Sequence, residues 1–435
     1  MKSFIKTFLK FASVVIVLFV AIVMLINTSP FDEELSPEVK KIIQDVPMPV
    51  VEGNAYYAIM GINTQANKDI IEAGHELILR YLENRKNGVD DIIAKDYKEI
   101  LGNTISNGQS WQSEVKYCDE NEINCLSYLS KNTTNEYLNT PILQALLKRY
   151  SEISEMKVFS SFIDRTFATP LISYASMTRL SQVKLASAYK LENRAEFLKL
   201  LNKDIKFWKV LLNQGSLFID KMVAVSAINR NLSYLSEYIR DNSLVESDHI
   251  LINEMLIALT PIELDFSKSF IAESIPFLNL TDEMTMGTGF SWYENFLYQP
   301  NATKNLFYER EVKSNVKLAQ LTLHDLIKAR NSGVVDYNNG FELHYIYNFL
   351  GKTLLEYNNS LAYTDYIVRA HDLNNMIKMV AIQYQVKIDD QPIQQILSQP
   401  QNVNIYNGQS FEYDEDSQLL QFKCLAHYQE CRIKF

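Results

Sequence analysis

The four cysteines of this sequence are spaced in a way that points to specific chemistry. They form two pairs with six intervening residues each, Cys118 with Cys125 and Cys424 with Cys431. One interpretation is a zinc site, but structural zinc sites usually set two cysteines only about two to four residues apart. A second is buried free thiols, for which two equal spacings would be a coincidence. The third, which we favour, is two local disulfides, and these persist only in an oxidising compartment.

Bridge geometry restricts the local structure around each pair. A disulfide joins α-carbons about 4.4–6.8 Å apart, whereas residues seven apart in a straight helix are separated by about 10 Å. Each pair must therefore flank a turn. The segment DENEIN between Cys118 and Cys125 has the polar composition of a turn, whereas LAHYQE between Cys424 and Cys431 is also compatible with a helix. Pairing of Cys118 with Cys424 or Cys431 is the alternative connectivity if the two regions meet.

Glu273 and Ser274, in the segment FIAESIPF, are the candidate catalytic pair. They resemble the Glu-Ser pair that begins the catalytic motif of lytic transglycosylases, which are likewise exported and helical. A glutamic acid in an apolar pocket can have a raised pKa and protonate a glycosidic oxygen, and Ile271, Ile275 and Phe277 are apolar neighbours. The Gly-Leu-Met-Gln signature of that family is absent, and GFSW follows in its place. The alternative interpretation is a solvated glutamate at a helix end.

The six histidines do not form a recognised catalytic or metal-binding motif. The sequence lacks the HExxH, GxSxG and P-loop patterns. HDL occurs twice, at His324 and His371, and two such helices packed together could bind a metal ion with the help of His344. Isolated histidines on helices more often lie on a polar face or bond to a core partner. We therefore expect neither a metal site nor a cofactor.

Asp204, Lys221 and Arg230 are charged residues within strongly apolar helical segments. They could form a polar active centre. Burial of a charge is costly unless the charge is paired, so we favour ion pairs between neighbouring helices, or long side chains that extend to solvent. These three residues are therefore not our catalytic candidates, and Glu273 remains the candidate catalytic residue.

The first 27 residues have the pattern of a membrane anchor. Residues 11–26 contain no charge, and extension to Phe4 gives 23 residues, where a helix needs about 20 to cross a bilayer. Lys6 and Lys10 interrupt the longer stretch, but their side chains can extend to the lipid headgroups. The alternative is a cleaved signal peptide, yet INTSPFDEE contains no A-x-A-like cleavage site and no cysteine for lipid attachment. We predict a retained signal-anchor that contacts the membrane through residues 4–26.

Charges on the two sides of this segment predict its orientation. Lysines precede it and acidic residues follow it: Lys2, Lys6 and Lys10, then Asp32, Glu33 and Glu34. Positive charge stays on the cytoplasmic side of a membrane, so the long C-terminal part is expected outside. In a bacterium, this places the anchor in the inner membrane and the body in the periplasm, where disulfides can persist.

Composition favours a helical protein and argues against nucleic-acid binding. The 435 residues include 52 Asp and Glu but only 42 Lys and Arg, a formal net charge of −10, and they contain no concentrated basic stripe. Hydrophobic residues make up 47%, enough for a sizeable core. Glycine (13) and proline (11) are scarce, whereas β-sandwich and Rossmann-like folds need more of them for turns. We therefore predict an all-α fold of packed helical hairpins.

The chain divides into four predicted parts. Residues 1–27 are the anchor, and residues 28–50 are a proline-containing linker with one short helical stretch, PEVKKIIQD. Residues 51–395 form a helical domain, and residues 396–435 form a small β-containing subdomain. Within that subdomain, the alternation in SFEYDEDSQLLQFKC predicts a β-hairpin at residues 409–424.

The helical domain is predicted to contain one long amphipathic helix, one helical hairpin and one long loop. Apolar residues step by threes and fours through residues 215–240, which predicts one helix with this buried face: Phe218, Met222, Val225, Ile228, Leu232, Leu235 and Ile239. Residues 185–213 have the pattern of a helical hairpin with its turn near Glu192 and Asn193. Residues 276–303 contain two prolines, two glycines and several aromatics, so we expect a long loop there, and such loops are often functional.

Three stretches resemble a group of uncharacterised, membrane-anchored helical proteins of proteobacteria. These stretches are GNAYYAIMGI, the run from Ala186 through DKMVAVSAINRNLSYLSEYI, and YNGQSFEYDEDSQLLQF near the C-terminus. The resemblance covers most of residues 50–430. It implies a bacterial inner-membrane anchor with a periplasmic body, and it implies no particular activity.

The sequence therefore predicts a single-pass, periplasm-facing helical protein that acts as a binding or scaffolding component of the cell envelope. Its expected partners are the membrane and other envelope proteins, and not nucleic acid. The alternative function is cleavage of envelope glycan, with Glu273 as acid and base. A Glu273 side chain inside an apolar, loop-lined pocket would favour the enzyme, and one in open solvent would favour the scaffold.

The first prediction concerns topology. Alkaline phosphatase fused to the C-terminus should be active in intact cells, because the enzyme needs an oxidising compartment and the lysine-rich side of the anchor stays in the cytoplasm. Green fluorescent protein fused at the same place, exported by the same route, is the control and should stay dark. The opposite pair of results would reject export, and with it the argument for disulfides.

Overall fold

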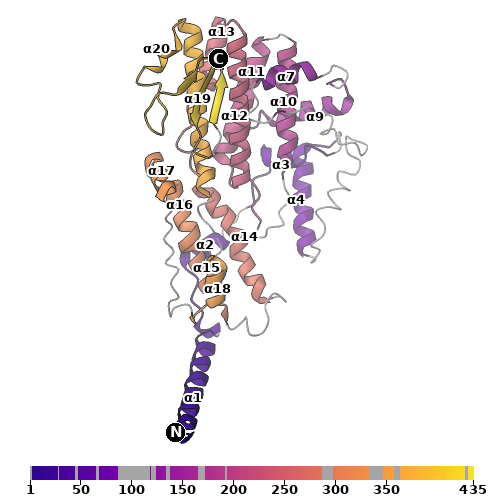
Figure 1. Cartoon of the computed structure of the whole chain (residues 1–435). Coiled ribbons are helices and arrows are strands. Elements are labelled where there is room, and N and C mark those ends of the chain that lie inside the picture. Colours follow the sequence, from indigo (N-terminus) through magenta and orange to yellow (C-terminus); the bar gives the residue numbers. More distant parts are fainter. Residues whose placement is uncertain are drawn as a thin grey trace. The chain divides into compact units, whose positions relative to one another are not determined.

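The computed structural model is built mainly of helices, with a small antiparallel sheet near the C-terminus (Figure 1). This confirms the predicted all-α class, with an N-terminal apolar helix and a small C-terminal β element. The structure describes residues 2–27, 29–44, 48–64, 68–86, 118, 124–133, 138–164, 172–191, 194–286, 297–332, 346–356, 363–426 and 430–435.

The chain divides into two compact units. Unit 1 consists of Met1–Pro47, Ile163–Ala168 and Ser267–Thr364. Unit 2 consists of Met48–Phe162, Thr169–Phe266 and Asp365–Phe435. This grouping differs from the composition-based parts, because it joins segments far apart in the sequence that pack on a common core. Composition along the chain does not reveal such packing.

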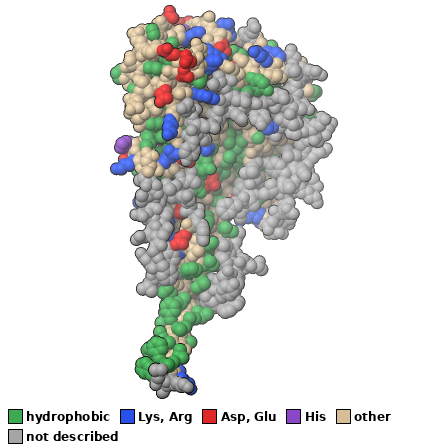
Figure 2. Space-filling view, in the orientation of Figure 1, with side chains coloured by type: hydrophobic (Ala, Val, Ile, Leu, Met, Phe, Trp, Pro, Cys, Tyr) green, Lys and Arg blue, Asp and Glu red, His purple; other side chains and the backbone are tan. Residues whose placement is uncertain are grey.

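Unit 1 begins with the apolar helix α1 (Lys2–Ile26). Its segment Phe4–Ile26 is long and apolar enough to cross a membrane, and none of its most apolar window is buried in the protein. Figure 2 shows hydrophobic side chains covering this helix. Such an uncovered apolar surface is suited to a lipid environment.

The segment after α1 belongs to the core of unit 1. It contains the 3₁₀ turn η1 (Ser29–Phe31) and α2 (Pro37–Gln44), which corresponds to the short helical stretch expected in the linker. Val39 of α2 is fully buried in a hydrophobic cluster with Leu278, Phe307, Val312 and Leu355. Within the predicted linker, α2 therefore packs in this cluster through Val39.

The other helices of unit 1 are short apart from α14. They are α14 (Ser267–Met286), α15 (Pro300–Phe307), the π-helical turn η3 (Tyr308–Val312), α16 (Lys313–Ala319), α17 (Leu323–Ser332) and α18 (Phe349–Glu356). The expectation of a loop was wrong for residues 276–286 and 300–303, because α14 continues through Pro276 and α15 begins at Pro300. Residues 287–296 lie outside the described part of the chain. A proline inside a helix costs about 3 kcal/mol. Ala272, Ile275 and Leu278 are all buried, so packing on both sides of Pro276 offsets that cost.

Unit 2 contains the other helices that the structure describes. They are α3 (Ala55–Met60), α4 (Ile70–Lys86), α7 (Cys125–Asn132), α9 (Pro141–Ile153), α10 (Tyr174–Lys190), α11 (Arg194–Gln214), α12 (Phe218–Asp241), α13 (Glu246–Met255), α19 (Thr364–Asp389) and α20 (Ile393–Leu397). Helices α10 and α11 confirm the predicted hairpin. The apolar stripe of α12 is also confirmed, since Ile228, Leu232, Leu235 and Ile239 are all fully buried.

The sheet of unit 2 has three strands, one more than the predicted hairpin. Strands β1 (Glu412–Asp414), β2 (Leu419–Lys423) and β3 (Glu430–Lys434) are antiparallel in the order β1-β2-β3. Leu420 lies opposite Tyr413 on one side and Ile433 on the other. Leu420, Phe422 and Ile433 are buried, so one face of the sheet covers the core, and β3 contacts α12. Period-two alternation in β3 is too short to have been recognised.

Two glycines allow α3 and α4 to pack closely. A Cβ added to Gly74 on α4 would lie 1.8 Å from the carbonyl oxygen of Tyr57, and one added to Gly61 would lie 2.0 Å from that of Ile70. Both distances are far below a possible contact, and both obstacles are backbone atoms. Glycine is therefore required at each position for steric reasons.

We predict that Gly74→Ala destabilises the protein by about 1–3 kcal/mol, because α3 and α4 must separate. Helix propensity alone predicts the opposite sign, since alanine is about 1 kcal/mol better than glycine inside a helix. Denaturant unfolding of the two proteins measures the difference. A variant that is more stable than the parent would show that the close approach of the helices is wrong.

Candidate functional site

The catalytic candidate Glu273 lies on α14 with an exposed side chain, beside Ile271, which is also exposed. Ser274 is buried, and its hydroxyl donates to the carbonyl oxygen of Ile271 at 2.6 Å, a bond within the helix. The glycan-cleaving hypothesis requires an apolar enclosure for Glu273, and this exposed position does not provide one. The GFSW segment lies outside the described residues, so the hypothesis stays a prediction.

The two HDL segments have different environments. Burial lowers the pKa of His371 to about 4, so its imidazole is neutral at physiological pH. The neighbouring Asp372 accepts hydrogen bonds from the backbone N–H of Leu425 at 2.9 Å and of Ala426 at 3.0 Å, and it fixes the chain after β2. Among the described residues, no three His, Cys, Asp or Glu side chains gather as metal ligands. His344 lies outside them.

Two local disulfides are present, Cys118–Cys125 and Cys424–Cys431, in agreement with the spacing argument. Their α-carbons are 5.9 and 5.6 Å apart, within the range that a bridge requires. Cys125 begins α7, Cys424 directly follows β2, and Cys431 lies in β3. Both α-carbon distances are well below the separation of about 10 Å in a straight helix, so neither pair lies within one continuous helix.

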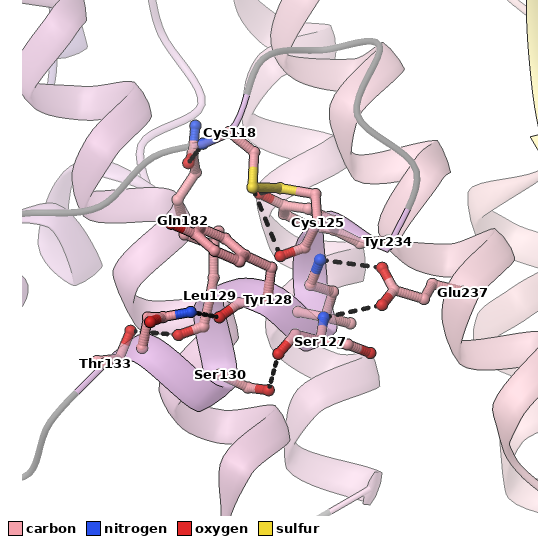
Figure 3. Close-up of a disulfide and its surroundings, with 12 residues drawn as sticks. Cys118, Cys125, Ser127, Tyr128, Leu129, Ser130, Thr133, Gln182, Tyr234 and Glu237 are labelled. Atoms are coloured by element: carbon pink, nitrogen blue, oxygen red, sulfur yellow. Dashed lines mark hydrogen bonds between the residues drawn. A yellow bond between two sulfur atoms is a disulfide. The ribbon is translucent and has the colours of Figure 1, made fainter.

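Figure 3 shows that the first disulfide is part of a larger attachment of α7. Both oxygens of the Glu237 carboxylate, on α12, accept hydrogen bonds from the first turn of α7: from Leu126 N–H at 2.9 Å and from Ser127 N–H at 2.8 Å. The backbone N–H of Cys118 donates to Gln182 of α10 at 3.1 Å. An anion at a helix N-terminus is favourable, because unpaired N–H groups and the helix dipole converge there. Helix α7 is therefore held against α10 and α12.

This attachment places the other end of α7 at a pocket of about 680 Å³. Its lining comes from the C-terminal parts of α7 and α10, the first turn of α11 and the residue after α12: Ser130, Lys131, Tyr189, Lys190, Arg194, Phe197 and Asn242. Among the lining residues that the structure describes, three side chains are cationic and none is a carboxylate. This described part of the lining is therefore positively charged, on a protein with a net charge of −10.

Aromatic rings form the apolar wall of the pocket. The ring centroids of Tyr189 and Phe197 are 5.4 Å apart in an edge-to-face arrangement, and Phe197 stacks on Tyr238 at 5.4 Å. Phe197 and Tyr238 are fully buried, which fixes this wall to the core. Partial burial raises the pKa of Tyr189, so its phenol is neutral and can donate a hydrogen bond. The pocket thus combines cations with a rigid aromatic surface.

The carboxylates near the pocket have other partners. Glu237 accepts from the N-terminus of α7, and Asp241 accepts from the guanidinium of Arg240 at 2.7 and 2.9 Å. Lys190 donates to the carbonyl oxygen of Thr133 at 2.7 Å, and Arg194 contacts that of Ser243 at 3.5 Å. Both of these acceptors are neutral carbonyl groups. The two cations therefore keep their net charge at the pocket.

Asp204 on α11 is the buried polar centre of unit 2, and its side chain is 2% exposed. Its Oδ2 accepts hydrogen bonds from Ser181 at 2.7 Å, from Asn231 at 2.7 Å and from the indole of Trp208 at 3.1 Å. The hydroxyl of Tyr150 donates to Oδ1. These four donors come from α10, α12, α11 and α9, so one carboxylate connects four helices.

The expected ion pairing is replaced at Asp204 by hydrogen bonds to neutral groups. Burial raises its pKa to about 6, although the bonds from Asn231 and Trp208 and the charge of Arg230 act in the opposite direction. Lys221 on α12 donates to the carbonyl oxygen of Leu212 at 2.6 Å and lies 5.1 Å from the ring centroid of Phe266. These contacts give Asp204 and Lys221 structural roles in the helix bundle.

Sequence reasoning missed the pocket. Lys190 and Arg194 flank the predicted turn of the α10–α11 hairpin, so their proximity could have been noticed. Lys131 lies about 60 residues earlier, and only the packing of α7 on α10 and α12 brings it near them.

No protein-family model, curated protein or solved structure matches this chain.

The raised pKa of Asp204 predicts that the stability of the folded protein depends on pH. The carboxyl binds its proton more tightly in the folded protein, with a pKa of about 6, than at the ordinary value of 3.8. Its contribution to stability is therefore fully present below about pH 4 and is lost as the pH rises through about 6. One pKa unit corresponds to about 1.4 kcal/mol, so the change amounts to about 3 kcal/mol.

Asp204→Asn removes this titration and keeps most hydrogen bonds, because the amide can donate to Tyr150 while its oxygen accepts the other three. Unfolding free energies of both proteins should be measured by denaturant between about pH 4 and pH 7. We expect the advantage of the parent over the variant to shrink by about 3 kcal/mol across that range. Parallel pH profiles would contradict the raised pKa.

Proposed function

We propose that this protein is a single-pass component of the bacterial inner membrane, with a periplasmic body that binds a ligand or partner of the cell envelope. The apolar α1 supports membrane attachment, and the two disulfides support an oxidising compartment on the far side. The lysines in the first part of α1 and the acidic residues after α1 support the orientation.

The end of α1 supports a retained anchor. Asn27 is 2% exposed, and its amide donates to the carbonyl oxygens of Val23 at 2.8 Å and Ile346 at 2.9 Å. Its side-chain oxygen accepts from the backbone N–H of Asn348 at 2.8 Å. We call these bonds the Asn27 clamp. Cleavage near residue 28 would remove Asn27 and leave buried polar groups unsatisfied, which costs about 1–3 kcal/mol for each group.

The pocket at α7, α10 and α11 supports a binding role, and Arg194 is the observation that carries it. Lys131 and Lys190 lie in the last turns of their helices, where cations are favourable whether or not a ligand binds. Arg194 is the first residue of α11, where the helix dipole is positive and a cation is unfavourable. Helix stability therefore does not explain Arg194, whereas an anion in the pocket would.

The ligand that fits is a small anion joined to an apolar or aromatic group. The cations attract a phosphate, sulfate or carboxylate group, and an arginine can bind such a group with two parallel hydrogen bonds. The half-buried ring of Tyr189, which packs edge-to-face on Phe197, supplies apolar surface for the remainder. A free small molecule and an anionic group on a larger envelope component share this chemistry.

The test uses the full chain in lipid nanodiscs and 1-naphthyl phosphate as the probe, followed by calorimetric titration. We expect binding that is at least about tenfold tighter than that of neutral 1-naphthol, because a charge-assisted hydrogen bond contributes about 1.5–3 kcal/mol. Arg194→Gln should weaken phosphate binding by about tenfold and leave 1-naphthol unchanged.

Lys199→Gln is the matched control, since Lys199 is an exposed cation on the same helix that does not line the pocket. It should bind the probe as the parent does. Equal affinities for 1-naphthyl phosphate and 1-naphthol, or equal losses in the two variants, would reject an anion site at this pocket.

A further inference from the structure

The Asn27 clamp positions a second segment of unit 1 next to the end of α1. Asn348, which the clamp contacts, is fully buried. Its side-chain oxygen accepts from the backbone N–H of Gln299 at 2.9 Å, and its amide donates to the hydroxyl of Thr303 on α15 at 3.0 Å. A continuous set of hydrogen bonds therefore runs from the last turn of α1 into the helices of unit 1. Such a connection fixes which residues lie at the end of α1.

The residues fixed there include exposed aromatic side chains. Phe31 is 53% exposed and Phe349 is 41% exposed. Between them, Tyr347 is half-buried, and its hydroxyl donates to the carbonyl oxygen of Phe31 at 3.1 Å. Single exposed phenylalanines are common on protein surfaces and need no explanation. Here, the hydrogen bond from Tyr347 connects Phe31 to the segment that contains Phe349. The bond between Asn348 and Asn27 connects the same segment to the end of α1.

Their position relative to a bilayer follows from the length of α1. The polar headgroup layer extends about 5–8 Å beyond the hydrocarbon on each side. Phe31 comes five residues after Ile26, and its carbonyl oxygen bonds to Tyr347, the neighbour of Asn348, so Phe31 lies close to the end of α1. Phe349 follows Asn348, which bonds directly to Asn27. When α1 spans a bilayer, both rings are therefore at its surface.

We propose that Phe31, Tyr347 and Phe349 form an aromatic seat that holds unit 1 in the headgroup layer of the bilayer spanned by α1. This inference rests on the proposed membrane attachment. Aromatic side chains concentrate at this depth, because their rings are apolar and, in tyrosine, one end is polar. The occupant of the seat is a lipid surface, since α1 continues directly into it.

The charges around the seat are compatible with a lipid surface. Asp32 accepts from the backbone N–H groups of Asn301 and Ala302 at 3.0 Å, at the start of α15, and Glu33 accepts from Asn305 at 3.1 Å. Both acids therefore have partners within the protein. Lys352 lies 5.6 Å from the ring centroid of Tyr347 and donates to its backbone carbonyl.

The phenol of Tyr347 adds no charge to this surface. Burial, together with the carboxylates of Asp32 and Glu33, raises the pKa of Tyr347 to about 12. The group is therefore neutral at physiological pH and remains a hydrogen-bond donor. With Lys352, Asp32 and Glu33 near it, the aromatic surface has charges of both signs beside it, which suits zwitterionic headgroups and does not require anionic lipid.

The test places a fluorophore in the seat of the full chain reconstituted in phosphatidylcholine vesicles. Phe349→Cys is labelled with nitrobenzoxadiazole, and the four native cysteines are protected as disulfides. Leu321→Cys is the matched control, because Leu321 belongs to the same unit and has a similar exposure of 38%. We expect emission at position 349 to be several-fold brighter, and to be quenched by nitroxide on the lipid headgroups, whereas position 321 stays dim and unquenched.

Two results would overturn the seat in distinguishable ways. If the protein resists a high-salt wash but position 349 is as dim and unquenched as position 321, α1 is inserted and the seat alone is wrong. Release of the protein by the wash would reject membrane attachment, and the seat with it. A bright label that nitroxide lipids do not quench would also reject the seat and indicate a protein partner or a second copy instead.

A clamp variant provides an independent check. Asn27→Ala removes the bonds to Ile346 and Asn348 but leaves the apolar helix unchanged. We expect the variant to stay in the vesicles while quenching at position 349 falls at least twofold. Unchanged quenching would show that the clamp does not position the seat. Labelling at Phe31→Cys gives the same readout without alteration of Phe349.

Discussion

The buried carboxylate of Asp204 is the constraint on which the arrangement of unit 2 depends. Removing a carboxylate from water costs several kcal/mol unless hydrogen bonds replace its hydration. Four donors on α9, α10, α11 and α12 do so. None of these helices can slide without leaving a buried donor or the carboxylate unsatisfied. Hydrophobic burial supplies most of the free energy, but it is non-directional and tolerates alternative packings that these bonds exclude.

The pocket takes its geometry from the same helices. Tyr189 and Lys190 end α10, and Arg194 and Phe197 begin α11, so the helices that Asp204 joins also hold two walls of the pocket. Glu237 and the first disulfide hold α7 and its lysine against them. The helices that carry the cations are therefore fixed relative to one another within unit 2. For the proposed ligand, this would limit the conformational entropy lost on binding.

Local patterns in the sequence predicted the elements whose formation depends on residues close together in the chain. The uncharged run of α1, the apolar stripe of α12 and the seven-residue cysteine spacing each depend on neighbours along the chain. The passage of α14 through Pro276 depends instead on tertiary packing, which outweighs the local cost of proline. The pocket and the Asn27 clamp depend on contacts between residues far apart in the sequence, and no local pattern encodes these.

Asn27 differs from the other residues of the anchor in a way that bears on biogenesis. An asparagine at the end of an apolar helix contributes nothing to membrane insertion, yet this one is buried and bonded to a segment 319 residues later. In the proposed export, which proceeds from the N-terminus onwards, Ile346 and Asn348 would emerge long after α1. Their bonds to Asn27 can form only if α1 is still attached at that time. The hydrogen bonding of unit 1 therefore supports the proposed retained anchor.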